Sequence, residues 1–122
     1  MFDLKEWMKK VNEWISARNY TGYGTYTGIT DYGSASNSFV VPSDGMIKLI
    51  IQYQSNRWVR AIVRNSDDSN EQTFQISNCG SANHVGGTQT AIPVFKGQKI
   101  YVLRGGNDSY CDYIPFVGGG ST

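Results

Sequence analysis

Apolar residues near the N-terminus recur at spacings of three and four, while Lys, Glu and Asn fill the positions between them. At 100° per residue the apolar side chains fall within about 120° of arc, which predicts an amphipathic helix. We assign residues 1–19 to this helix, as a stalk or an oligomerisation element. The apolar stripe consists of Leu4, Trp7, Met8, Val11, Trp14 and Ile15.

The apolar stripe needs a partner, because an isolated helix of this length is marginal in water. Three partners would satisfy it: the protein's own β-domain, other copies of the helix, or a membrane surface. Part of the stripe repeats in heptad steps of four, three and four, as in coiled coils. The bulky Trp7 and Trp14 at the edge of that seam would fit a trimeric contact better than a dimer.

The pattern changes to short apolar runs and strict alternation further along the chain. Two apolar runs flank Pro42-Ser43-Asp44-Gly45, in which Pro presets φ and Gly allows the chain to reverse. We expect residues 20–117 to form a β-sandwich of about seven or eight short strands, mostly β and of jelly-roll type. Residues 20–28 form an extended linker or an irregular first strand, and their Tyr and Thr content favours the strand. The expected strands after it are 38–41, 46–53, 58–64, 72–77, 88–95, 99–103 and 110–116. In 58–64 the alternation places Arg60 and Arg64 on the solvated face. Residues 118–122 are expected to be a flexible tail.

Composition limits the class of protein. The 122 residues hold 11 Lys and Arg against 10 Asp and Glu, so the overall charge gives no reason to expect nucleic acid. No segment approaches the roughly 20 apolar residues of a membrane span, and the charged N-terminus does not read as a signal peptide. Cys79 and Cys111 are expected to be reduced thiols rather than a disulfide.

Catalytic and metal-binding patterns fail on residue count or spacing. His84 stands without a second ligand at metal spacing, and 67–71 lacks the oxygen alternation and the Gly of a calcium loop. The candidate carboxylates lie in turns or at strand ends rather than as a pair facing a cleft. We therefore predict a non-enzymatic protein with no catalytic residues, no metal site and no cofactor. Those carboxylates are Asp31, Asp44, Asp108 and Asp112.

Two predicted hairpin tips combine aromatic rings with hydrogen-bonding groups. Such a combination suits carbohydrate binding, because an aromatic ring stacks on the C–H face of a sugar while polar groups form hydrogen bonds with its hydroxyls. The candidate ligand-binding residues are Arg57 and Trp58 at one tip, with Asn107, Asp108 and Tyr110 at the other. The alternative for Trp58 is packing in the core or at a subunit interface.

Three segments in this order resemble a known family. They are residues 38–47, with the Pro-Ser-Asp-Gly turn, then 92–100, with Lys96-Gly97, then the closing Tyr113-Ile114-Pro115-Phe116. Together they resemble the C1q/TNF-like jelly-roll heads of bacteriophage tail fibres and receptor-binding proteins, over roughly residues 30 to 117. The resemblance implies a homotrimer with a shaft on the N-terminal side, where the helix stands.

These observations lead to one main expectation and two alternatives. The main expectation is a phage or prophage fibre or spike head, located in the virion, that binds a host surface polysaccharide. Its partners would be two further copies of the chain and other virion proteins, without nucleic acid and without membrane insertion. The alternatives are a monomeric carbohydrate-binding β-sandwich and a structural decoration protein that binds no ligand.

Overall fold

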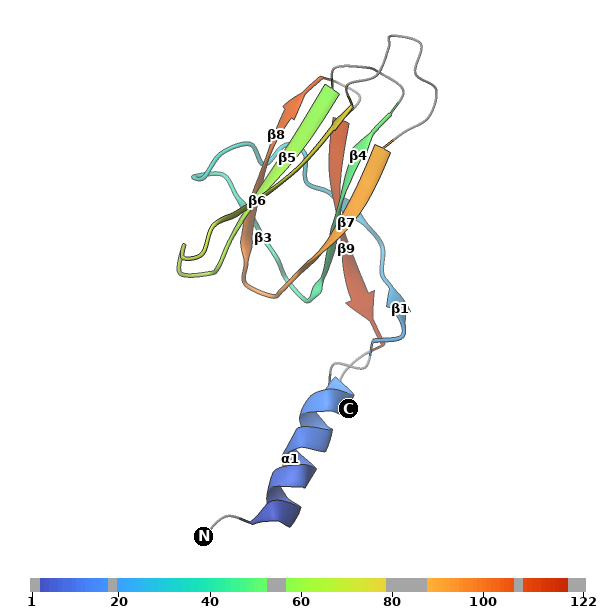
Figure 1. Ribbon diagram of the computed structural model, residues 1–122, viewed down its shortest axis with the longest axis vertical. Helices are drawn as coiled ribbons and strands as arrows, with labels where there is room; N and C mark the ends of the chain where they lie inside the picture. The colour runs from blue at the N-terminus through green and yellow to red at the C-terminus, as the bar shows by residue number, and fades with distance from the viewer. Residues whose placement is uncertain (1–2, 18–19, 53–56, 79–87, 107–108, 119–122) are drawn as a thin grey trace.

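Helix α1 (Leu4–Ala17) forms where the apolar stripe predicts a helix, and it extends away from the β-domain (Figure 1). The computed structural model describes residues 3–17, 20–52, 57–78, 88–106 and 109–118. The Asp3 carboxylate accepts a hydrogen bond from the Glu6 N–H at 3.2 Å, as expected of a residue that caps a helix N-terminus.

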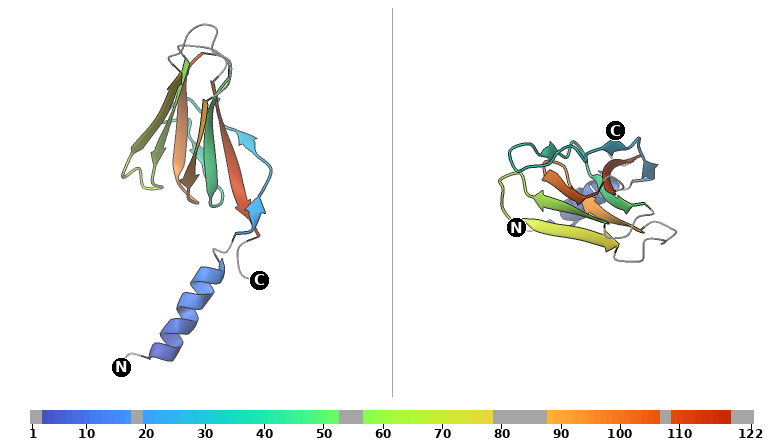
Figure 2. Two further views of the ribbon diagram at one scale, coloured as in Figure 1. Left: turned by 45° about the vertical axis from the view of Figure 1, so that its right-hand side comes forward. Right: turned by 90° about the horizontal axis from the view of Figure 1, so that it is seen from above.

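The rest of the described chain forms two antiparallel sheets packed face to face, a β-sandwich (Figures 1 and 2). The first sheet has the order β1-β9-β4-β7, with β2 also paired to β9, and the second has the order β3-β8-β5-β6. The strands are β1 (Gly22–Tyr23), β2 (Thr27–Gly28), β3 (Phe39–Val40), β4 (Gly45–Ile51), β5 (Arg57–Arg64), β6 (Gln72–Asn78), β7 (Thr88–Val94), β8 (Lys99–Gly105) and β9 (Ser109–Val117). The mostly β prediction is confirmed, and the irregular first strand proves to be two short ones.

The core lies between the sheets and follows the alternation along the strands. In β4, residues 45, 47, 49 and 51 are buried while those between them are half-buried on the outer face. In β5, Arg60 and Arg64 lie on the outer face, as predicted. Residues with no exposed surface include Ile29, Ile47, Leu49, Ile51, Val59, Ala61, Ile100 and Cys111.

Two predicted hairpins are wrong. We expected hairpin tips before β5 and between β8 and β9, but β4 and β5 lie in different sheets, and so do β8 and β9. In both cases the strands before and after the predicted turn therefore belong to opposite sheets instead of pairing with each other. Among the described strands, β5 and β6 are the consecutive pair that forms a hairpin, with Val63 opposite Gln72.

The turns that carry the family resemblance meet at the end of the sandwich nearest α1. Asp44 accepts hydrogen bonds from the Lys96 N–H and the Tyr20 hydroxyl, both at 2.9 Å. The Gly97 N–H donates to the Val41 carbonyl at 2.8 Å, and Gly97 has a φ of 90° that favours glycine. Asp44 is a turn residue, as expected, and its carboxylate also links the 42–45 turn to the 95–98 turn and to Tyr20 before β1.

Cys111 is a free thiol buried in the core, whereas Cys79 lies outside the described residues. Burial, with a smaller contribution from the neighbouring Asp112 carboxylate, raises the pKa of the Cys111 thiol to about 12. Since the thiolate is the reactive form, we expect Cys111 to resist iodoacetamide at pH 8 in the native protein. Mass spectrometry of the Cys111 peptide should show rapid alkylation in urea and almost none without it. Equal rates in both conditions would contradict the buried position.

Candidate functional site

Trp58 lies half-buried on the outer face of the β3-β8-β5-β6 sheet, opposite Gly105 of β8. A Cβ at position 105 would overlap the indole ring, so the glycine provides the space that the ring occupies. The residue is therefore a surface element of a strand, neither buried between the sheets nor confined to a loop.

The other candidate ligand-binding residues do not gather around Trp58. Arg57 packs against Gly106, where an added Cβ would overlap its side chain. Tyr110 stands opposite Ile50 on the outer face of the other sheet, so the sandwich separates it from Trp58. Asn107 and Asp108 lie outside the described residues.

Arg60 forms an ordered cluster with Trp58 and two residues of β6. Its guanidinium carbon lies 5.0 Å from the centroid of the Trp58 ring, and its Nε donates to Gln75 Oε1 at 2.8 Å. Gln75 Nε2 in turn donates to Ser77 Oγ at 3.1 Å. These contacts fix the plane of the guanidinium on the sheet surface, a geometry that suits bidentate recognition of an anion.

A second cationic cluster lies further along the same face. The Arg64 guanidinium carbon is 5.8 Å from the Tyr101 ring centroid, and Arg64 Nη2 donates to the Ala35 carbonyl at 3.4 Å. Asp68 Oδ1 lies 3.9 Å from Arg64 Nη1 and 3.0 Å from Lys99 Nζ. Asp67, one residue earlier in the same turn, also interacts electrostatically with Lys99, so the two cations of this cluster face two carboxylates.

The two sheets differ sharply in charge, although the whole chain is nearly neutral. The strands of the β3-β8-β5-β6 sheet contain five basic residues and no Asp or Glu, whereas those of the other sheet contain Lys48 and Asp112 alone. Sequence reasoning placed Arg60 and Arg64 on a solvated face but did not identify them as a site. The five are Arg57, Arg60, Arg64, Lys99 and Arg104.

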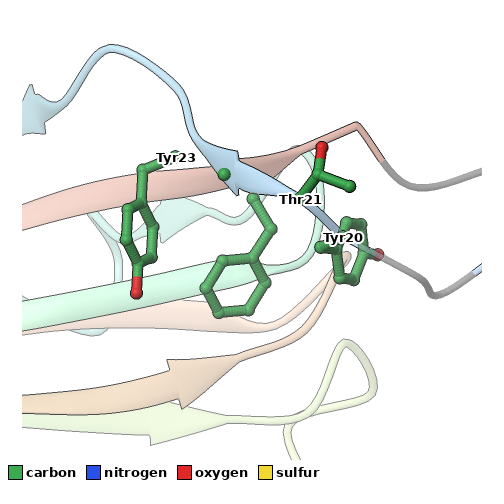
Figure 3. Close-up of a pocket in the computed structure, with 5 residues that line it drawn as sticks. Tyr20, Thr21 and Tyr23 are labelled. Atoms are coloured by element: carbon green, nitrogen blue, oxygen red, sulfur yellow. The ribbon is translucent and has the colours of Figure 1, made fainter.

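A basal patch of aromatic and apolar residues lies on the first sheet at its α1 end. Its centre is Phe116, whose ring centroid lies 5.3 Å from that of Tyr20 and 6.0 Å from that of Tyr23. Tyr20, Thr21 and Tyr23 line a hollow of about 390 Å³ there (Figure 3). A neighbouring hollow of about 590 Å³ includes Phe95, which is 57% exposed. The basal patch, as used below, comprises Tyr20, Tyr23, Met46, Phe95 and Phe116.

The apolar stripe of α1 is exposed in its described part. Leu4, Trp7 and Met8 are 58%, 52% and 51% exposed, and Val11 is half-buried. The side chains of Trp14 and Ile15 lie outside the described residues. In the part of the chain that the structure describes, no helix has the length and apolar character needed to cross a membrane.

Other titratable groups form no reactive arrangement in the described chain. The 67–71 segment is the β5–β6 turn, in which Ser69 Oγ and the Ser69 N–H donate to Asp67 and lower the pKa of that carboxyl. Burial raises the pKa of Asp112, a change that nearby Lys48 partly offsets. No group of three or more potential metal ligands occurs in the described residues. His84 lies outside the described residues.

Comparison of the chain with protein-family models, with curated proteins and with solved structures gives no match. The strand order, the exposed surfaces and the charge distribution are therefore the features that bear on function.

Proposed function

We propose that this chain is a homotrimeric head-and-stalk component of a bacteriophage or prophage fibre or spike. In this proposal the β-sandwich is a jelly-roll head that attaches to a host cell-surface glycan, and α1 is the stalk. The role is binding and structural rather than catalytic. The observation that carries the proposal is the order in which the strands pair.

The strand pairs are nested along the chain. β5 pairs with β6, β4 with β7, β3 with β8, and β2 with β9. This is the pattern of one long hairpin folded over into two sheets, which is how a jelly roll is built. The turns that resemble those of C1q/TNF-like heads lie at the folds, where the chain passes from one sheet to the other.

Exposed apolar surface supports the oligomeric part of the proposal. Helix α1 ends at Ala17 and the basal patch begins at Tyr20, so the two exposed apolar segments are close in the sequence. An amphipathic helix gains most of its stability from burying its stripe against a partner. Bringing three stripes together along an axis would also bring the basal patches of the three heads close to that axis.

The test is the mass of the full-length protein in solution, measured by light scattering. We expect three times the 13.6 kDa mass of the chain. Replacing Leu4 and Met8 together with glutamine should raise the dissociation constant of the trimer by several orders of magnitude. The change affects two side chains on each of three chains, and burying one such side chain is worth ~1.5–3 kcal/mol.

The matched control replaces Lys9 and Glu13 with glutamine. These residues have the same four-residue spacing on the polar side of α1, and the exchange leaves the net charge unchanged. The control should remain trimeric at concentrations where the Leu4 and Met8 variant is a monomer. A wild-type monomer would overturn the trimer and favour a monomeric carbohydrate-binding sandwich, for which the ordered Arg60 and Trp58 cluster already provides a candidate surface.

A further inference from the structure

We infer that the outer face of the β3-β8-β5-β6 sheet binds an acidic polysaccharide, with Arg60 as the central anion-binding group. The inference deepens the proposed function, since it names the chemical class of the glycan and the face that holds it. It does not require the trimer, so the two proposals can fail separately.

Charge complementarity identifies the ligand as an anion. Of the basic residues on the strands of this sheet, Arg60, Arg64 and Lys99 lie on its outer face. Asp68 and Asp67 balance Arg64 and Lys99, which leaves the charge of Arg60 without a counterion among the described residues. A polymer with regularly placed carboxylates would balance the excess charge better than a neutral glycan.

Arg60 is prepared for such a contact. Its Nε is occupied by Gln75, and the stacking of the guanidinium on Trp58 holds its plane. No described residue accepts a hydrogen bond from its terminal nitrogens. Because the side chain is already ordered, little conformational entropy is lost when those nitrogens bind a carboxylate.

The spacing of cations and rings favours an extended polymer over a single small anion. Arg60 and Arg64 are four residues apart on one strand, which separates their Cα atoms by about 13 Å. Ile62 lies between them and is only 7% exposed, so little accessible apolar surface separates the two cations. The Trp58 and Tyr101 rings lie against the guanidinium groups of Arg60 and Arg64, so each ring positions one of the two cations.

The test is isothermal titration calorimetry of the full-length protein with polygalacturonate at low ionic strength. Neutral dextran and single-stranded DNA serve as the comparison ligands. We expect binding to polygalacturonate, weakening as salt is added, with no heat from dextran and weaker binding to DNA. Arg60→Gln should weaken polygalacturonate binding about tenfold, the effect expected from loss of one charge-assisted contact.

Two further variants separate the site from a general charge effect. Lys48→Gln removes the same charge from the outer face of the other sheet and should leave the affinity unchanged. Gly105→Ala removes no charge but displaces the Trp58 ring that orients Arg60, so it should also weaken binding. Circular dichroism checks that each variant is folded.

Several results would overturn the inference: no binding of polygalacturonate, equal losses from Arg60→Gln and Lys48→Gln, or tighter binding of DNA. A trimer that does not bind polygalacturonate would refute this inference and leave the head-and-stalk proposal standing. A monomer that binds it through Arg60 would do the reverse.

Discussion

Gly45→Ala is expected to cost about 3 kcal/mol or more of the free energy of unfolding, a large part of the total for a domain of this size. Gly45 is buried at the start of β4, between β7 and β9. A Cβ there would overlap the carbonyl oxygen of Ile114 and lie 2.9 Å from the Cα of Pro115. These are backbone atoms of a paired strand, so they cannot move aside as a flexible side chain would.

Urea denaturation followed by circular dichroism measures this effect as a lower midpoint with an unchanged slope. Gly28→Ala is the matched control, because the nearest atom to its added Cβ is Asp112 Oδ1 at 3.8 Å. We expect that control to stay within about 0.5 kcal/mol of the wild type. If Gly45→Ala lost as little stability as the Gly28→Ala control, β4 and β9 would not approach as closely as described.

Leu49→Ala is expected to lower the free energy of unfolding by about 2–5 kcal/mol. Leu49 has no exposed surface and lies in the middle of β4, between Thr90 of β7 and Cys111 of β9. Its truncation would leave a cavity between the sheets, where the surrounding strands are too constrained to close it.

The neighbouring Ile50 provides the control, since Ile50→Ala removes a similar side chain from the outer face. We expect less than half the loss seen for Leu49→Ala in the same urea titration. The reverse order would mean that β4 is shifted by one residue, because such a shift exchanges the buried and outer faces.

The elements of this fold were predictable because each one depends on local pattern. The spacing of Leu4 and Met8 indicates a helix, and the alternation in β5 identifies Val59, Ala61 and Val63 as buried. It misses Ile62, which is on the outer face but is also buried. Such patterns depend on neighbours within a few positions along the chain, and those neighbours are visible in the sequence.

The pairing of strands was less predictable. A turn such as Pro42–Gly45 fixes a few dihedral angles, but it does not determine whether the next strand pairs with the last or crosses to the other sheet. For the same reason, the sequence placed Trp58 and Tyr110 at two hairpin tips and did not show that they lie on the outer faces of opposite sheets. The decisive information is which distant strands share a sheet.

The basic outer face of the β3-β8-β5-β6 sheet was not predicted, because the sequence does not show which strands are neighbours. The net charge of +1 averages over the whole chain, and the concentration of arginines becomes visible only when β5 and β8 are known to be neighbours. The cluster of Arg60, Trp58 and Gln75 likewise joins β5 and β6, so no motif within a single strand predicts it.

The nested pairing also determines how the chain must fold. The β5–β6 hairpin joins segments that are close in sequence, and hairpins of that kind form in about 1–10 μs. Each later pair closes a longer loop, until β9 joins the segments next to α1 from the far end of the chain. Such high contact order gives folding times of about milliseconds to seconds. The outer face formed by β5 and β6 is therefore expected to form first, and the end of the sandwich beside α1 last.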